Sequence, residues 1–165
     1  MTMRRARKPR RAPKKRPRRR SVPTAAPRQS AAETALLALA RTLATARTAD
    51  PSPREAVTRT LATLAASFQA GAPLPRALAQ ARLAALGDKT RALALAWARE
   101  QLRLVLGEVL ERAAAAGAVR VGLSPDSIAW ILLAACEALA DEPPQAAPDR
   151  IRALEDWLTG GYLDD

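Results

Sequence analysis

The sequence predicts an all-α protein, a bundle of about six helices that follows a disordered basic tail. Hydrophobic residues make up 48% of the chain, yet aromatic residues make up only 3%. A core built largely of alanine, with fewer leucine, isoleucine and valine side chains, favours closely packed helices. Stop and start residues also divide most of the chain into segments of helical length, and the excess positive charge is confined to one end.

The net charge of +11 divides the chain into two parts. Residues 1–28 contain thirteen Arg and Lys, five Pro and no acidic residue, whereas the remaining residues contain fourteen basic and sixteen acidic side chains. Because like charges repel and proline interrupts helices, we expect residues 1–29 to be a disordered tail. Residues 30–165 are expected to form the all-α domain.

The tail has a dense strip of cations with no aromatic residue between them. Without aromatic side chains for base stacking, its attraction is to phosphate charge alone, so we expect it to bind nucleic acid without reading the sequence. A solubilising extension, contact with an anionic membrane surface, and a nuclear-import signal at Pro13–Arg20 are alternatives. The candidate nucleic-acid-binding residues are Arg4, Arg5, Arg7, Lys8, Arg10, Arg11, Lys14, Lys15, Arg16, Arg18, Arg19 and Arg20.

The first two expected helices carry leucines at helical spacing. The first covers residues 31–48 and stops before Pro51. The second begins where Ser52 can act as N-cap, with Pro53 at the first helical position and Glu55 three residues after the cap. Gly71 permits the left-handed turn that ends the second helix. The apolar stripe of this helix is formed by Val57, Leu61, Leu64 and Phe68.

Four further helices follow. A short helix over residues 74–86 is closed by Gly87, and Asp88 then caps a long helix that reaches residue 116. Charged side chains on the long helix, such as Arg103 and Glu108, are interpreted as a solvated face. Ser124-Pro125-Asp126 starts the next helix, a loop rich in proline covers residues 141–148, and the last helix covers residues 149–159.

Residues 128–136 are nine consecutive apolar residues. In a helix they point in every direction around the axis, so the helix must be surrounded. A domain of this size offers few helices for that purpose, and we therefore expect a second copy of the chain to cover it. The expected homodimer interface consists of Ile128, Ile131, Leu132, Ala135, Leu139, Ile151, Leu154 and Leu158.

Composition argues against most enzyme classes. The chain has no histidine and a single cysteine, Cys136, which excludes histidine-based catalysis, internal disulfides and thiolate-rich metal sites. Glycine-rich phosphate loops are also lacking, so we expect no catalytic residue, metal or cofactor. Glu33 and Arg41 leave too short an apolar run for a secretory signal, and no stretch could span a bilayer. A cytoplasmic location is expected.

The order of segments in the second half is distinctive. The long helix ends in small residues at 113–117, a short connection covers 118–123, and Ser124-Pro125-Asp126 opens the apolar helix 128–139. The final helix, 151–158, leads into Gly160-Gly161. Residues 102–140 and this final segment resemble the C-terminal regulatory domain of TetR-type transcriptional repressors, and the helix start at 52–57 resembles the second regulatory helix of that family.

The resemblance implies a dimeric regulator whose apolar helix and final helix pack in a four-helix bundle between subunits. It also implies an apolar ligand pocket between the second, long and apolar helices, for which Leu64, Phe68, Trp97 and Trp130 are candidates. Core filling is the alternative role for those side chains. TetR-type proteins begin with a helix-turn-helix that reads bases, and nothing in residues 1–30 resembles it, so operator reading is not implied.

Two functions remain after this comparison. In the first, the chain is a non-enzymatic TetR-like transcriptional regulator, a homodimer with a domain of the ligand-binding type, and its tail makes DNA contact that is independent of sequence. In the second, the chain is a helical interaction module that heterodimerises with another regulator and does not bind DNA itself. Removal of residues 1–28 distinguishes them, because only the first function predicts a loss of DNA retention.

Overall fold

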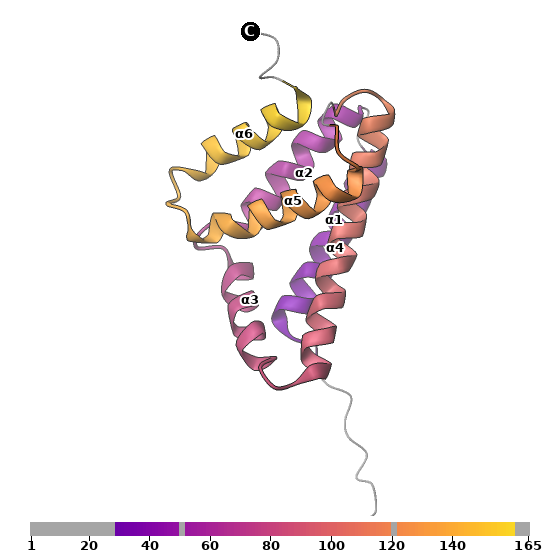
Figure 1. Ribbon diagram of the computed structural model, residues 1–165. Helices are drawn as coiled ribbons and strands as arrows, with labels where there is room; N and C mark the ends of the chain where they lie inside the picture. The colour runs from indigo at the N-terminus through magenta and orange to yellow at the C-terminus, as the bar shows by residue number, and fades with distance from the viewer. Residues whose placement is uncertain (1–28, 50–51, 120–121, 161–165) are drawn as a thin grey trace, which may run out of the picture.

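The computed structural model describes residues 29–49, 52–119 and 122–160, without the side chains of residues 46–49. All secondary structure in these ranges is helical, as the sequence predicts, and no strand occurs among them (Figure 1). The elements are α1 (Ala31–Ala49), α2 (Pro53–Phe68), α3 (Pro73–Ala84), α4 (Lys89–Ala115), α5 (Pro125–Ala138), the 3-10 turn η1 (Leu139–Asp141) and α6 (Ala147–Thr159).

The predicted helix starts are confirmed by their hydrogen bonds. Ser52 Oγ accepts a bond from the Glu55 backbone N–H at 3.2 Å, and Ser124 Oγ accepts one from the Ser127 N–H at 3.2 Å. Asp88 Oδ1 accepts bonds from the first turn of α4, including that of the Thr90 N–H at 3.0 Å. These side chains satisfy backbone donors that have no partner within the helix.

Glycine ends two of the helical segments in the predicted way. Gly71 follows α2 with φ +85°, and Gly117 follows α4 with φ +69°, a backbone region that side chains with a Cβ rarely occupy. The last helix differs from the prediction because it begins at Ala147 rather than residue 149. Pro148 therefore lies in the first turn of α6, where a missing N–H costs no helical hydrogen bond.

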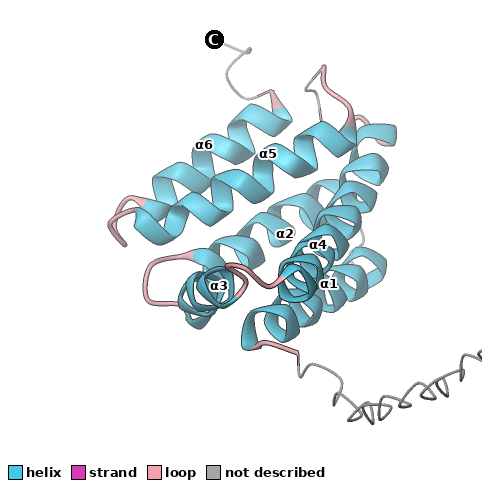
Figure 2. Ribbon diagram, turned by 60° about the horizontal axis from the view of Figure 1, so that its bottom comes forward, coloured by secondary structure: helices cyan, strands magenta, loops and turns pink. Residues whose placement is uncertain are grey.

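The helices form two layers around the long helix α4. Helices α1 and α4 run side by side in the same direction, and α3 packs against both of them (Figure 1). Helices α5 and α6 form a second layer in which both helices pack on α2 and α5 also packs on α4 (Figure 2). The core between the layers includes the completely buried side chains of Leu36, Leu61, Leu64, Phe68, Leu102, Leu106, Leu132, Leu133 and Leu158.

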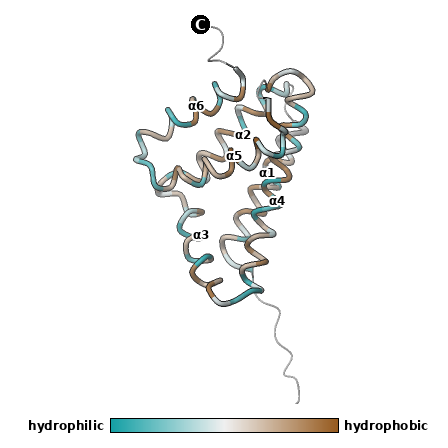
Figure 3. The backbone as a smooth tube through the Cα atoms, in the orientation of Figure 1, coloured by the Kyte–Doolittle hydropathy of each residue, from teal (hydrophilic) through white to brown (hydrophobic). Residues whose placement is uncertain are grey.

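Figure 3 colours the backbone by hydropathy, and apolar segments occur along α1, α2 and α5, the helices that supply many of the buried core residues. No helix in the described part of the chain is both long and apolar enough to cross a membrane.

The apolar run in α5 is covered differently from the prediction. Five of its nine residues, Ile128, Ala129, Leu132, Leu133 and Cys136, are at most 1% exposed within a single chain. They are hidden because α5 crosses α4 on one side and packs on α2 as well. One chain therefore buries more than half of this run, whereas Trp130 remains 56% exposed and Ile131, Ala134 and Ala135 are only partly buried.

Candidate functional site

The strip of tail cations, Arg4 to Arg20, lies outside the described residues. The candidate surfaces described here therefore belong to the helical domain. There are three such surfaces. The first is a groove between α5 and α6, the second is the outer side of the place where α4 and α5 cross, and the third is a cluster of charged side chains from α3, α4 and α5.

The four residues predicted for a ligand pocket do not line one cavity. Leu64 and Phe68 are completely buried on α2, where they form part of the core. Trp97 and Trp130 are each 56% exposed. On α4 the buried positions nearest to Trp97 are Ala98 and Leu102, so the phase of the helix turns Trp97 outward. The predicted quartet thus divides between the core and the surface.

The residues predicted for the dimer interface also divide into two sets. Four of them are at most 2% exposed within one chain and belong to its own core, namely Ile128, Leu132, Leu139 and Leu158. The other four are half-buried and still present surface, namely Ile131, Ala135, Ile151 and Leu154. Only the second set can meet a partner without unpacking the domain.

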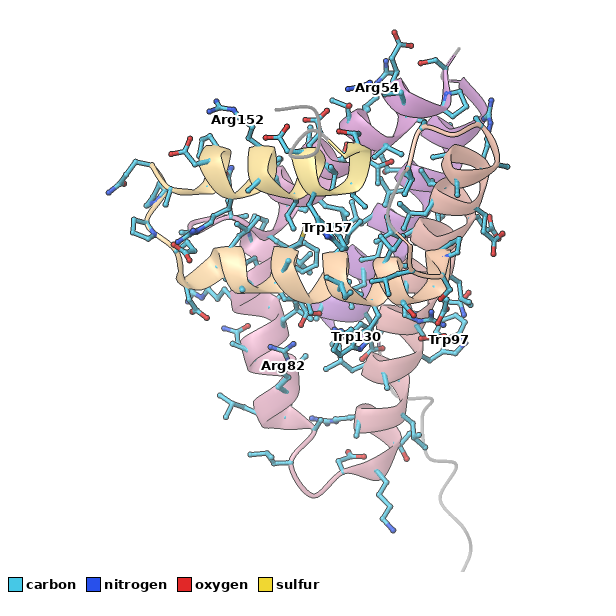
Figure 4. The ribbon with its side chains drawn as sticks, turned by 45° about the horizontal axis from the view of Figure 1, so that its top comes forward. Arg54, Arg82, Trp97, Trp130, Arg152 and Trp157 are labelled. Carbon is cyan, nitrogen blue, oxygen red and sulfur yellow. The ribbon has the colours of Figure 1, made fainter. Side chains whose placement is uncertain are left out.

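A groove separates α5 from α6 on the outer side of the second layer. Its volume is about 300 Å³. Arg150 Nε lies 3.5 Å from Glu142 Oε1, and this ion pair is the only charged part of the lining. Trp157 is half-buried and lies between the two helices in Figure 4. The lining residues of this α5–α6 groove are Ala135, Ala138, Leu139, Glu142, Arg150, Ala153 and Leu154.

Arg103 on α4 joins α4 to α5 where the two helices cross. Its Nε donates to Glu100 Oε2 at 2.8 Å, and its Nη1 pairs with Asp126 in the first turn of α5. The hydrogen bond from Arg103 lowers the pKa of Glu100, and the hydrogen bonds to Glu100 and Asp126 raise the pKa of Arg103. The interpretation of Arg103 as part of a solvated face is corrected, because its side chain is only 17% exposed and joins two helices.

The outer side of this crossing carries exposed apolar side chains. A shallow cavity of about 380 Å³ lies there, and its lining includes Leu123, Trp130 and Arg103. The labelled tryptophans, Trp97 and Trp130, lie near the crossing in Figure 4. Leu93, Trp97 and Leu104 share one face of α4 because they are separated by four and seven residues, and all three are exposed. The sequence could have indicated this surface, because the spacing of the three residues from the apolar positions Ala98 and Leu102 places them on another face of α4.

A second cluster, the Glu137 bridge, joins three helices. Glu137 on α5 accepts a bond from Arg99 Nε on α4 at 2.6 Å and from Arg82 Nη2 on α3 at 3.0 Å. The Glu137 side chain is only 18% exposed. No local pattern reveals this bridge, because its members are far apart in the sequence and each stands in a different helix. Sequence reasoning missed it for that reason.

Cys136 has no features of a reactive thiol. Its side chain is completely buried, and burial raises the pKa of the Cys136 thiol to about 12, with a smaller contribution from the charge of Glu137. Within residues 29–49, 52–119 and 122–160, no group of three acidic or sulfur ligands could hold a metal ion.

A scan against protein-family models, a search of curated proteins and a search of solved structures found no match for this chain.

Proposed function

We propose that this protein is a non-enzymatic, dimeric TetR-like transcriptional regulator whose N-terminal cations contact DNA without reading its sequence. The observation that carries the proposal is the α5–α6 groove. It is a partly exposed apolar surface, and it lies on the two helices through which the resemblance to TetR-type domains implies dimerisation.

The groove suits a contact between two copies of the same surface. Ala135 and Ala138 on α5 face the groove together with Ala153 and Leu154 on α6, so a partner helix can approach closely without displacing long side chains. In a two-fold symmetric dimer the same groove occurs on both subunits, and each would cover the apolar surface of the other. The ion pair between Arg150 and Glu142 would lie at the rim of that contact.

The N-terminal cations supply the DNA contact in this proposal. The described body has no comparable cluster of positive charge, because its arginines are largely paired with neighbouring carboxylates such as Glu100, Asp126 and Glu137. A dimer carries two copies of the cationic strip. If about eight cations of one strip meet phosphates, the logarithm of the binding constant falls against the logarithm of salt concentration with a slope of roughly −7.

The dimer is tested by a charge placed in the groove. Ala138 and Ala153 are exposed, so Ala138→Arg can be introduced without disturbing the core of the subunit. We expect Ala138→Arg to sediment as a folded monomer when the wild-type chain sediments as a dimer. The matched control is Ala114→Arg, at an exposed position near the end of α4, which should remain dimeric. A monomeric wild-type chain at micromolar concentration would reject the dimer.

The DNA contact is tested by deletion of residues 1–28. We expect the shortened chain to lose retention on duplex DNA while its sedimenting mass still corresponds to a dimer. Unchanged retention would reject this role for the tail and would favour the alternative, an interaction module that pairs with another regulator.

A further inference from the structure

A groove between α3 and α4 combines an apolar lining with two arginines. Its volume is about 350 Å³, which is near the lower end of the roughly 300–1,000 Å³ that small-molecule sites occupy. Leu86, in the turn between the helices, is 77% exposed at the edge of the groove, and Leu78 is buried at its base. The lining residues are Leu78, Arg82, Ala85, Leu86, Ala92, Leu95, Ala96 and Arg99.

The lining of this groove has two arginines and no acidic residue. Arg82 and Arg99 share a single carboxylate, that of Glu137, at 3.0 and 2.6 Å. Of the other acidic residues nearby, Asp88 pairs with Arg91, and Glu100 and Asp126 both pair with Arg103. The Glu137 bridge itself therefore has a surplus of one positive charge where it meets the apolar lining.

The two guanidinium groups also have hydrogen-bonding capacity to spare. Each guanidinium has five N–H donors, and the bridge uses one from Arg82 and one from Arg99. The Arg99 side chain is only one-third exposed, at 33%, so its electrostatic interactions are less screened than those of a fully exposed arginine. A planar group with two oxygen atoms matches the donors that remain.

We propose that this groove binds an amphipathic monocarboxylate. The carboxylate lies on Arg82 and Arg99, and an aliphatic tail lies along Leu78, Leu86 and Leu95. A single negative charge neutralises the surplus of the cluster, and the tail covers the exposed surface of Leu86. A neutral apolar molecule would leave that surplus in place, and a cation would be repelled by it.

This inference adds a ligand class to the proposed regulator. It rests on the proposed function only in one respect, namely that the ligand would regulate contact with DNA. Binding itself needs no DNA and no dimer. The groove lies on α3 and α4 and shares no lining residue with the α5–α6 groove, and its lining includes none of the four pocket residues that the family resemblance implied.

The test is isothermal titration of the full chain with octanoate, with 1-octanol and octylammonium as probes that share the tail but not the charge. We expect saturable binding of octanoate, binding about tenfold weaker or more for 1-octanol, and no binding of octylammonium. Arg99→Gln and Arg82→Gln should each weaken octanoate binding by about tenfold. The matched control is Arg152→Gln on α6, an arginine with one carboxylate partner outside the groove, which should leave binding unchanged (Figure 4).

Substitution of Glu137 distinguishes two roles for Arg82 and Arg99, namely contact with the ligand and a purely structural role in joining the helices. Because Glu137 occupies the same guanidinium groups that the ligand would use, Glu137→Gln should tighten octanoate binding by about fivefold if the helical circular dichroism is retained. Equal affinity for octanoate and 1-octanol, no saturable octanoate binding, or unchanged affinity in Arg99→Gln would each overturn the proposal. Octanoate binding by a full chain that is not retained on duplex DNA would instead reject the regulator and leave the groove.

Discussion

Truncation of Leu132 tests whether one chain buries the apolar face of α5. Leu132 is completely buried against α4 and α2 in the single chain. Leu132→Ala removes three carbon atoms, worth about 2.4 kcal/mol at ~0.8 kcal/mol for each buried CH₂. The unfilled cavity adds to this loss, so we expect the free energy of unfolding to fall by about 3 to 5 kcal/mol. That is a large part of the roughly 5–15 kcal/mol available to a domain.

The measurement is urea denaturation followed by circular dichroism, repeated at low and at high protein concentration. Because Leu132 packs within its own chain, the difference between variant and wild type should be the same at both concentrations. Leu93→Ala, at a position that is 71% exposed, is the control and should change the free energy by less than about 0.5 kcal/mol. A loss below about 1 kcal/mol, or a loss found only where the chain is dimeric, would refute the single-chain core.

Four further results are expected. Asp88→Ala removes the acceptor for two backbone N–H groups of α4 and should lower the free energy of unfolding by about 1 kcal/mol, measured in urea; no change would contradict the cap. Cys136 should resist a thiol reagent at about pH 8 until urea is added, and immediate reaction would contradict its burial. Its thiol pKa is raised from 9.0 to about 12 on folding, so the stability from the neutral thiol is present below pH 9 and is lost as the pH rises toward 12. Urea titrations across this range should show a decline that Cys136→Ala lacks. Arg103→Met should lower the melting temperature and raise the pKa of Glu100, detectable by carboxylate NMR, whereas an unchanged pKa would show that the two side chains do not interact.

The helices could be predicted from the sequence because their ends carry local chemistry. Ser52, Asp88 and Ser124 have hydroxyl or carboxylate oxygens at the N-cap, and Gly71 and Gly117 have the positive φ that ends a helix. Such signals involve residues within a few positions of one another, so they can be recognised in a short stretch of sequence without knowledge of how the helices pack. The early start of α6 was missed because Pro148 looked like a break although it suits the first turn.

The surfaces were harder to predict because they depend on how the helices pack. The apolar run of α5 indicated burial, but it did not show whether α2 and α4 or a second chain would provide the cover. The Glu137 bridge depends on α3, α4 and α5 meeting at one point, and no spacing in the sequence encodes that meeting. The exposure of Trp97 could have been predicted from the sequence, because its position around the helix relative to Ala98 and Leu102 places it on the outer face of α4.

The parallel course of α1 and α4 has a consequence for engineering. Helix α1 begins at the end of the molecule that holds the turn between α3 and α4, whereas the second layer lies over the opposite half (Figure 1). Any peptide grafted before Ser30 is thus anchored far from the α5–α6 groove. A fluorescent label or a replaced N-terminal peptide should therefore leave the α5–α6 groove uncovered, which makes the N-terminal junction a suitable place for modular replacement.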